Sequence, residues 1–387
     1  MSLEKKVPEI RFQGFSDEWR EIVIGTACSN FRSGKFIKAE DIKKSGDYPV
    51  YGGNGLRGFT SEYNHDGTYA LIGRQGALCG NMNYSCGKAF FTEHAIAVQA
   101  NEKNDTLFLY YKLGLMNLGQ YSGQSAQPGL SVNKLTELED FTPVKPEQTA
   151  IGTYFQKLDN LINQHKQKHD KLSNIKKAML EKMFPKQGET IPEIRFKGFS
   201  GEWVLRSWRD TVDISTNMVD PRSSQYGELL HVGPGNIESF TGMFYNNVLK
   251  VKDSNLISGK FHFNKGDILY GKINPQLAKY VIAPFEGLAS ADAYVLSAKN
   301  GVVQNYLYAI LQTDDFYKYT VSVSSRTGMP KINRDELNIY SYLSPDEAEQ
   351  QRIGNYFQKL DALINQHQQQ IIKLNNIKQA CLSKMFV

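Results

Sequence analysis

The stretch at residues 151–185 reads IGTYFQKLDNLINQHKQKHDKLSNIKKAMLEKMFP, and it decides the fold because the chain carries it twice. Its second copy reads IGNYFQKLDALINQHQQQIIKLNNIKQACLSKMFV at residues 353–387, with 24 of 35 positions identical at an offset of 202. A shorter stretch, PEIRFQGFSDEW at 8–19, returns as PEIRFKGFSGEW at 192–203. A repeat of this length indicates one folding unit per copy rather than a solenoid of short motifs.

Both copies of the long stretch show the heptad rhythm of paired helices. Apolar residues recur at alternating steps of four and three, which predicts helices near 38 residues, roughly 57 Å long at 1.5 Å per residue. Pro146-Glu147-Gln148 predicts one start. Ser344-Pro345-Asp346-Glu347, a capping box with proline at the first helical position, predicts the other. The predicted helix-pair interface consists of Ile151, Phe155, Leu158, Ile162, His165, Leu172, Ile353, Phe357, Leu360, Ile364, His367 and Leu374.

Neither helix can bury its apolar stripe alone, and the other copy is the obvious partner. An antiparallel pair within the chain is favoured over a parallel coiled coil between two chains, because both helices already share one molecule. A pseudo-two-fold axis then passes near His165 and His367, where we expect a polar layer that sets the register. A pH switch or a metal site is the alternative, and no further metal ligand is evident in the sequence. Gly152 and Gly354 fit a close backbone approach, although common ancestry of the copies explains them equally well.

The segments between the repeated stretches, roughly 20–145 and 204–345, show no defensible alignment with each other. Two related frames are therefore expected to carry two unrelated binding surfaces. The predicted fold class is α+β, with two mixed α/β domains separated by a pair of long antiparallel coiled-coil helices and an internal pseudo-two-fold repeat. The predicted boundaries are a first domain at 1–145 with its lead-in at 8–19, a central helix at 146–186, a second domain at 187–345 with its lead-in at 192–203, and a C-terminal helix at 346–387.

Both intervening segments place polar side chains in glycine-rich loops. The stretches YPVYGGNGLRGF at 48–59 and IGRQGALCG at 72–80 suit close approach to a ligand, and Arg, Gln and Asn pair well with base edges. In the second segment, HVGPGNI at 231–237 and FNKGDILYGKINPQLAKYV at 263–281 are typical of strand–turn–strand elements. SVSSRTGMPKINRDEL at 322–337 resembles SGQSAQPGLSVNKL at 122–135 in position and chemistry. Ordinary hairpin turns and solvated surface loops are the alternatives for these stretches.

Composition and missing motifs exclude several function classes. A hydrophobic content of 41% with 12% aromatic residues is ordinary for a globular protein, and a net charge of +5 permits nucleic-acid binding without arguing for it. No apolar run approaches the roughly 20 residues of a membrane helix, and no signal-peptide core is evident. Cys28, Cys79, Cys86 and Cys381 lack zinc-type spacing, so free thiols in a reducing cytosol are expected. Nucleotide-binding, metalloprotease and serine-hydrolase motifs are missing, which predicts a chain that recognises and positions without catalysing.

The order of these motifs resembles the specificity subunit of a Type I restriction-modification system. The resemblance spans the whole chain: a PEIRF…W lead-in, a variable domain, an EQxxIGxYFQKLDxLI helix, then the same order again. YGGNG…IGRxG in the first variable domain and GDILYGKINPQL in the second also resemble target recognition domains of that family. Each motif is weak alone, whereas their duplicated order is specific.

The resemblance implies a non-catalytic chain of the bacterial cytoplasm that binds double-stranded DNA at an asymmetric, bipartite, gapped site. Each target recognition domain is expected to read one half-site, and the helices are expected to set the gap. Two modification subunits are expected to methylate adenine at N6 with S-adenosylmethionine, and restriction subunits to add ATP- and Mg²⁺-dependent cleavage. No cofactor or metal is expected on this chain itself. The DNA-binding candidates are Arg32, Lys35, Tyr51, Asn54, Arg74, Gln75, Gln124, Ser125 and Gln127 in the first domain, and His231, Asn236, Lys272, Asn274, Gln276, Ser325, Arg326 and Lys331 in the second.

Two other classes of function compete with this interpretation. A stand-alone methyltransferase is disfavoured because the sequence lacks a cofactor motif, and binding of S-adenosylmethionine by the purified chain would favour it. A coiled-coil scaffold without DNA fits the helices but leaves the Arg, Gln and Asn side chains amid glycines unexplained. Duplex binding with a steep salt dependence would exclude the scaffold.

Overall fold

The computed structural model describes residues 7–123, 129–324 and 328–387. The chain divides into two compact units. The first unit joins two stretches that lie far apart in the sequence, and the second is one continuous stretch. Unit 1 comprises residues 1–164 and 370–387, and unit 2 comprises residues 165–369.

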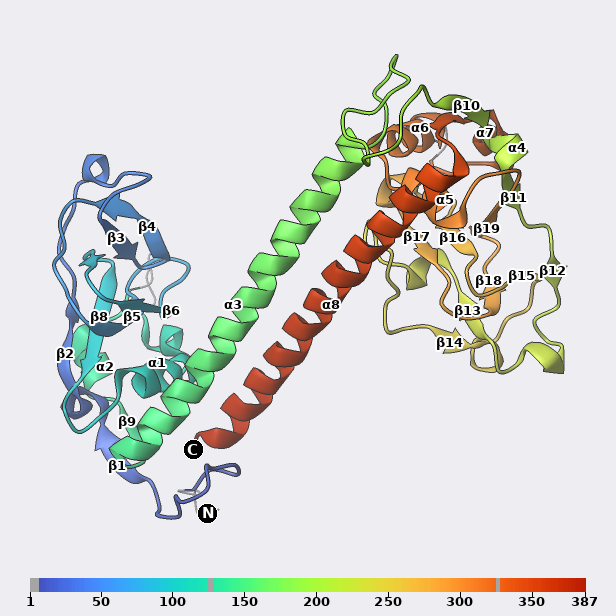
Figure 1. The fold of residues 1–387 in the computed structure, drawn as a ribbon. Coiled ribbons are helices and arrows are strands. Elements are labelled where there is room, and N and C mark those ends of the chain that lie inside the picture. Colours follow the sequence, from blue (N-terminus) through green and yellow to red (C-terminus); the bar gives the residue numbers. More distant parts are fainter. Residues whose placement is uncertain (1–6, 124–128, 325–327) are drawn as a thin grey trace. The chain divides into compact units, whose positions relative to one another are not determined.

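Two long helices, α3 (Lys145–Lys182) and α8 (Glu347–Met385), occupy the repeated stretches (Figure 1). Their 38 and 39 residues match the length that the heptad pattern predicts. Unit 1 takes the N-terminal part of α3 and the C-terminal part of α8, whereas unit 2 takes the remaining parts. Each unit is therefore completed by a helix segment from the other repeat.

The start of α8 differs from the prediction. Asp346 rather than Ser344 caps the helix, because the Asp346 Oδ1 atom accepts a hydrogen bond of 2.8 Å from the Glu349 backbone N–H. Ser344 belongs to strand β20 (Ser341–Ser344), where it pairs with Val204. The predicted capping box is therefore wrong, since strand pairing holds Ser344 before the helix begins.

The helix segments pack antiparallel within each unit. In unit 1 the Tyr154 hydroxyl lies 3.5 Å from the Cys381 thiol, and Asp159 forms an ion pair with Lys378. In unit 2 Asp361 forms the equivalent ion pair with Lys176. Residue numbers rise along one helix as they fall along the other, which confirms the predicted antiparallel pairing within one chain.

The body of unit 1 is built from antiparallel and mixed sheets. A central antiparallel sheet has the order β2-β8-β5-β6, and a second sheet has the order β4-β3-β7, in which β3 and β7 are parallel. A short ribbon, β1-β9, connects the body to α3. The strands are β1 (Arg20–Val23), β2 (Cys28–Ser33), β3 (Tyr48–Gly52), β4 (Gly55–Thr60), β5 (Thr68–Gly73), β6 (Met82–Cys86), β7 (Phe90–Phe91), β8 (Ala95–Ala100) and β9 (Glu139–Thr142), with helices α1 (Thr106–Leu115) and α2 (Val132–Thr136).

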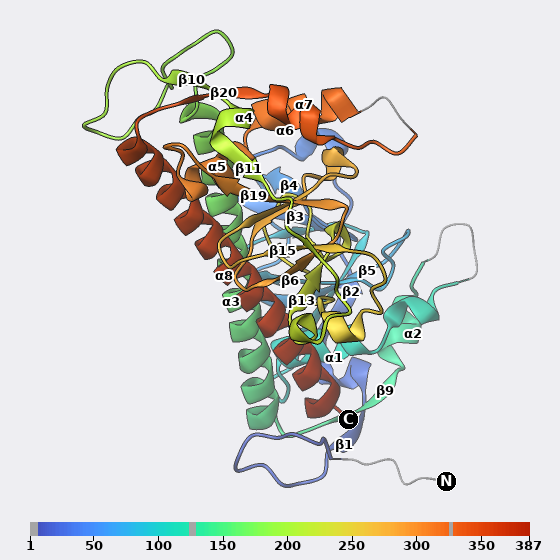
Figure 2. The same cartoon turned by 90° about the vertical axis from the view of Figure 1, so that its right-hand side faces the viewer.

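Unit 2 repeats the ribbon and the central sheet of unit 1, whereas its second sheet, of order β12-β15-β18-β13-β14, has two further strands. Its central sheet has the order β11-β19-β16-β17, its second sheet contains the parallel pair β13·β18, and its ribbon is β10-β20, which Figure 2 shows beside α4 and α7. The strands are β10 (Val204–Ser207), β11 (Val212–Ile214), β12 (Met218–Val219), β13 (Leu230–Val232), β14 (Leu249–Lys250), β15 (Lys260–Phe263), β16 (Ile268–Gly271), β17 (Tyr280–Ile282), β18 (Gly287–Ala289), β19 (Ala293–Ala298) and β20, with helices α4 (Trp208–Thr211), α5 (Gln304–Ile310), α6 (Asp314–Ser324) and α7 (Arg334–Ile339).

The matching strand orders confirm the α+β class and correct one expectation. The intervening segments were expected to be unrelated, yet β2, β8, β5 and β6 of unit 1 correspond in order to β11, β19, β16 and β17 of unit 2. Backbone pairing preserves this topology while the side chains differ. The two units are variants of one scaffold.

Aromatic residues fill the cores in equivalent positions. In unit 1 the Trp19 ring packs edge-on against Phe108 and against Phe386 from the end of α8. In unit 2 Trp203 packs in the same way against Tyr306 and Phe184. The repeated W and F of the sequence therefore anchor each lead-in to a helix end.

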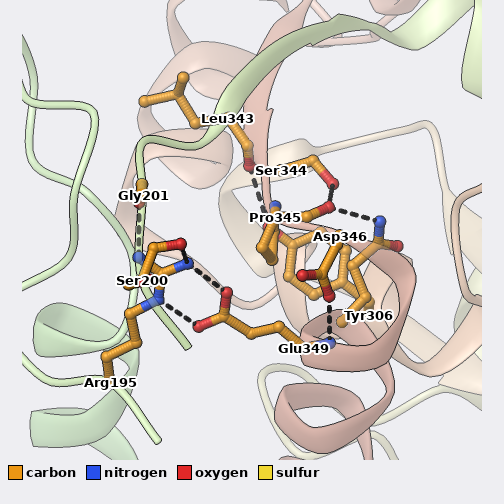
Figure 3. Close-up of polar contacts among 10 residues, drawn as sticks. Arg195, Ser200, Gly201, Tyr306, Leu343, Ser344, Pro345, Asp346 and Glu349 are labelled. Atoms are coloured by element: carbon orange, nitrogen blue, oxygen red, sulfur yellow. Dashed lines mark hydrogen bonds and ion pairs between the residues drawn. The ribbon is translucent and has the colours of Figure 1, made fainter. Parts of the chain in front are cut away.

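A buried ion pair ties each lead-in to the start of a long helix. The Arg195 guanidinium donates two hydrogen bonds of 2.7 Å to the Glu349 carboxylate, as Figure 3 shows beside the Asp346 cap. In unit 1 the Arg11 guanidinium likewise donates two hydrogen bonds of 2.7 Å to the Glu147 carboxylate. Two parallel N–H···O bonds fix both distance and direction, so this pair orients the helix against its unit.

Candidate nucleic-acid interface

Four loops of unit 1 meet at the end of strand β5. The Arg74 N–H donates to the His94 carbonyl and the Leu130 N–H donates to the Arg74 carbonyl, both at 2.9 Å. The Thr92 N–H donates to the Tyr51 carbonyl, also at 2.9 Å. We call this meeting point, formed by residues 51–54, 73–75, 92–94 and 129–130, loop junction 1.

Unit 2 forms the same arrangement at the end of strand β16. The Lys272 N–H donates to the Asp292 carbonyl at 3.0 Å, and the Ile332 N–H donates to the Lys272 carbonyl at 3.0 Å. The Ser290 N–H donates to the Val232 carbonyl at 2.7 Å. Residues 232–235, 271–273, 290–292 and 331–332 form loop junction 2, which matches loop junction 1 bond for bond.

Glycine is required where these loops touch. A Cβ atom on Gly34 would lie 2.1 Å from the Phe91 carbonyl oxygen, and one on Gly73 would lie 2.5 Å from the Gly53 carbonyl oxygen. Both distances are far below van der Waals contact, so larger residues would separate the loops. The glycine-rich motifs therefore serve close approach between backbones in the protein itself.

The described DNA-binding candidates of the first domain lie on or beside loop junction 1. Gln75 is exposed, and its Oε1 atom lies 3.1 Å from His94 Nδ1. Asn54 is exposed in the turn between β3 and β4, and Tyr51 packs edge-on against Phe91. Arg74 is half-buried at the centre of the junction.

Two further candidates flank this junction on the strand β2 side. The exposed Arg32 donates a hydrogen bond of 2.7 Å to Asn30 Oδ1. Lys35 is exposed, and its backbone N–H donates to the Phe91 carbonyl at 2.9 Å, one residue before Thr92. The loop at 33–36 is thus joined through Phe91 and Thr92 to the rest of the junction.

Lys272 and Lys331 give loop junction 2 a positive charge. The Lys272 ammonium lies 5.4 Å from the centre of the Tyr294 ring. Burial lowers the pKa of Lys272, the charge of Lys331 lowers it further, the carboxylate of Asp292 raises it, and the charge of Arg334 lowers it. Lys331 is exposed next to the backbone bridge that joins it to Ile273. Two clustered lysines provide the electrostatic attraction that an anionic ligand needs.

Three further candidates of unit 2 lie in the loops next to loop junction 2. Asn274 adopts a left-handed conformation with φ of 53°, and its N–H donates to the Pro330 carbonyl at 2.7 Å. Gln276 is exposed beside it, with its Nε2 atom 3.4 Å from Asn274 Oδ1. Asn236 is bound to its own loop, because its Oδ1 accepts from the Gly233 N–H at 2.7 Å and its Nδ2 donates to Asn247. Asn236 therefore shapes the loop that precedes the junction.

His231 lies on strand β13, directly before the junction residue Val232. Its Nε2 atom is buried without a hydrogen-bond partner among the described residues, and burial lowers its pKa. Five other candidates, Gln124, Ser125, Gln127, Ser325 and Arg326, lie outside the described residues. The described residues that follow them, Gly129 and Lys331, bridge to Gln75 and Ile273 at equivalent places.

Sequence reasoning missed two polar residues at loop junction 1. Glu93 and His94 sit between the apolar runs of AFFTEHAIAV, which is typical of a strand, and they fall in the gap between β7 and β8. The His94 Nε2 atom lies 3.2 Å from the Glu93 carboxylate. The sequence feature that could have indicated them is the polar tripeptide TEH at residues 92–94, which interrupts the apolar run. It corresponds at an offset of 198 to SAD at residues 290–292.

The predicted helix-pair residues divide between domain cores and the helix–helix contact. Ile151, Phe155 and Leu158 are buried in the core of unit 1, and Ile353, Phe357 and Leu360 are buried in that of unit 2. Leu374 and Leu172 are partly buried against those same cores. Ile162 is buried, and Ile364 lines a cavity of about 1030 Å³ in unit 2. His165 and His367 meet directly, with their Nδ1 atoms 2.9 Å apart.

Two further observations concern the described part of the chain. Within it, no group of three or more His, Cys, Asp or Glu side chains is placed to hold a metal ion. Among the helices of the described ranges, none is long and apolar enough to cross a membrane.

Comparison with known proteins decides the family. Residues 17–174 and 222–376 each match the family model described as the Type I restriction modification DNA specificity domain. The chain belongs to this family. Together the two matches cover most of the chain, and their duplication follows the two units. The specificity role and the family predicted from the sequence are thereby confirmed.

Relatives of this specificity subunit include two curated proteins of Escherichia coli. The EcoprrI specificity subunit is 44% identical over 136 residues, which is 34% of either protein. The chain thus spans about one third of that relative in this alignment. The EcoDI specificity subunit is 26% identical over 317 residues, covering 73% of the chain and 69% of the relative. Both are named as subunits of a type I restriction enzyme, so a specificity subunit works within a complex.

A solved structure supports the fold. The S subunit of the type I restriction-modification system from M. genitalium superposes with a TM-score of 0.69 at 14% sequence identity. The match covers 98% of this chain and 99% of that one. At this identity the similarity concerns the fold alone.

Proposed function

We propose that the chain binds double-stranded DNA at an asymmetric, bipartite, gapped site, with one unit reading each half-site. The observation that carries the proposal is the pair of loop junctions, which share their backbone hydrogen bonds and differ in their side chains. One scaffold with two sets of polar groups suits a target whose two halves differ in sequence. Base edges in the major groove supply the patterns that such side chains distinguish.

Each junction, together with the residues beside it, contains groups for both parts of DNA recognition. Lys35, Lys272 and Lys331 provide charge for phosphates, and replacing one of them should weaken binding to all sequences alike. Arg74, Gln75 and Asn54 in unit 1, and Asn274 and Gln276 in unit 2, provide donors and acceptors for base edges. The helices α3 and α8 are proposed to set the number of unread base pairs between the half-sites.

Catalysis is proposed to reside in partner subunits in the bacterial cytoplasm. Two modification subunits would use S-adenosylmethionine to methylate adenine at N6, and restriction subunits would use ATP and Mg²⁺ for translocation and cleavage. The chain itself is proposed to bind none of these cofactors. Its contribution is the choice of site.

Selection from a random duplex library tests this proposal. The purified complex of the chain with its modification subunits should enrich one non-palindromic motif with a fixed gap, and affinity should fall steeply as salt rises. Modification subunits alone serve as the control and should enrich no such motif. Equal binding of all duplexes by the complex would contradict the proposal.

A further inference from the structure

Loop junctions 1 and 2 can be compared position by position. Residues 73–95 correspond to 271–293 at an offset of 198, because the Ala95 N–H donates to the Thr92 carbonyl at 2.9 Å and the Ala293 N–H donates to the Ser290 carbonyl at 3.0 Å. The same offset relates the Gly73 N–H, which donates to the Asn81 carbonyl, to the Gly271 N–H, which donates to the Lys279 carbonyl, both at 2.8 Å. The correspondence rests on hydrogen bonds and does not require sequence similarity.

Some junction positions keep their chemistry in both units. Thr92 and Ser290 are both hydroxyl residues, and each accepts a hydrogen bond from the backbone N–H two residues later, at 3.3 and 3.2 Å. Arg74 and Lys272 are both cationic and occupy the centre of the hydrogen-bond network. The hydroxyl residues stabilise the loop, and the cationic residues provide attraction for an anionic ligand. Both functions are needed in both units.

Other positions change their chemistry completely. His94 corresponds to the exposed Asp292, and Glu93 corresponds to Ala291. Gln75, whose Oε1 lies 3.1 Å from the His94 ring, corresponds to Ile273. Unit 1 therefore presents an imidazole and an amide where unit 2 presents a carboxylate and an apolar side chain.

The His94 ring is oriented although it remains accessible. Gln75 contacts its Nδ1 atom at 3.1 Å and Glu93 contacts its Nε2 atom at 3.2 Å, while 44% of the side chain stays exposed. Contacts on both nitrogens limit rotation of the ring. A side chain that is fixed and still exposed meets the requirement for reading a base edge.

We propose that His94 and Asp292 occupy equivalent reading positions, each selecting one base pair in the half-site of its own unit. The inference rests on the proposed function and adds residues to it. In the free chain each ring nitrogen of His94 faces an oxygen acceptor, Gln75 Oε1 or a Glu93 carboxylate oxygen, so reading a base requires the Nε2–H to exchange Glu93 for an acceptor such as guanine N7 or O6. A carboxylate accepts instead from an amino group such as cytosine N4. The exchange of donor for acceptor at one place in the scaffold gives the two half-sites different bases there.

The test uses variants of the full chain coexpressed with its modification subunits in a host without adenine methylation. His94→Ala should make one position of the first half-site degenerate, and Asp292→Ala should do so in the second half-site. His94→Asp should shift the preference at that first position toward a base pair that presents an amino group. Gln13→Glu adds a negative charge on the exposed lead-in of unit 1 and should leave the motif unchanged.

Competition binding by the purified variant complexes provides a second readout. Discrimination should fall roughly 2- to 150-fold at one base pair, the range for loss of one neutral or charged hydrogen bond, with little change at the others. An unchanged motif in both alanine variants would overturn the inference. Equal loss at every position by a complex that still assembles would also overturn it, because a reading residue affects one position. A wild-type chain that directs no gapped methylation would instead reject the proposed function itself.

Discussion

Arg11 and Glu147 show how single residues hold the frame together. The Glu147 side chain is 1% exposed and the Arg11 side chain 11% exposed, so each depends on the other for compensation of its charge. Loss of one partner leaves a buried charge unpaired, whereas loss of both does not.

We predict that Arg11→Met destabilises the chain by about 3–5 kcal/mol and that Arg11→Met with Glu147→Leu is less destabilising. Denaturant unfolding of the three proteins measures the difference. Lys38→Met is the control, because Lys38 and Glu40 are 67% and 74% exposed and such pairs contribute at most about 1 kcal/mol. A double variant as unstable as the single variant would contradict the prediction.

Close packing against the helical glycines Gly152 and Gly354 is a second way in which single residues determine stability. A Cβ atom on Gly152 would lie 2.8 Å from Leu107 Cβ, and one on Gly354 would lie 2.7 Å from the Tyr306 backbone nitrogen. The close approach expected from the sequence is therefore present at both positions. Crowding should outweigh the helix propensity gained with alanine.

Alanine substitutions at these two glycines should therefore change the free energy of unfolding in the opposite direction to one at an uncrowded helical glycine. Gly152→Ala and Gly354→Ala should each lower the free energy of unfolding by about 1–3 kcal/mol. Gly114→Ala is the matched control in helix α1, where the nearest atom, Met82 Cγ, lies 3.7 Å away, and it should stabilise by up to about 1 kcal/mol. Thermal unfolding measures all three, and stabilisation by all of them would refute the packing argument.

At the scale of elements, α3 and α8 meet at the histidine pair. With Nδ1 atoms 2.9 Å apart, His165 and His367 can share one proton in a hydrogen bond, and a second proton removes the acceptor. Burial lowers the pKa of His367 below its usual 6.5, and the charges of His165, Lys168 and His169 lower it further. The polar layer expected from the sequence thus carries a pH dependence.

The sign of this dependence follows from proton binding. A lowered pKa means that the unfolded chain binds the proton more readily, so the contribution is present above pH 6.5 and is lost as pH falls through the folded pKa. We predict that stability declines less between pH 7.5 and pH 5.5 in a His165→Gln, His367→Gln variant than in the wild type. His262→Gln removes a histidine elsewhere in unit 2 and is the control. Identical pH profiles for the wild type and the double variant would exclude this role.

The helices also carry the proposed spacing function. Insertion of four residues, about one helical turn, near Lys168 should lengthen the unread gap and leave both half-sites intact. The same insertion near Gly188, in the loop after α3, is the control and should leave the gap unchanged. Methylated motifs of the two variants report the gap. An unchanged gap in an active Lys168 insertion variant would disprove the spacing function.

At the scale of the whole molecule, the helices and their pairing could be predicted because their signals are local. The heptads lie within single segments of the sequence, and the two copies of the long stretch match at 24 of 35 positions. The kinship of the two bodies could not be predicted, because strand pairs such as β5 and β8 join residues far apart and tolerate different side chains. His94 was missed for a related reason: its hydrogen bond to the Arg74 backbone spans 20 residues, and only the fold shows it.

The proposed specificity of the chain depends on two units that share one scaffold and bind different half-sites. A methylome tests this most directly: the chain is coexpressed with modification subunits in a host lacking adenine methylation, and N6-methyladenine is mapped on native DNA. We predict one gapped, non-palindromic motif that disappears when the chain is omitted. Methylation that persists without the chain, or a contiguous motif without a gap, would contradict it.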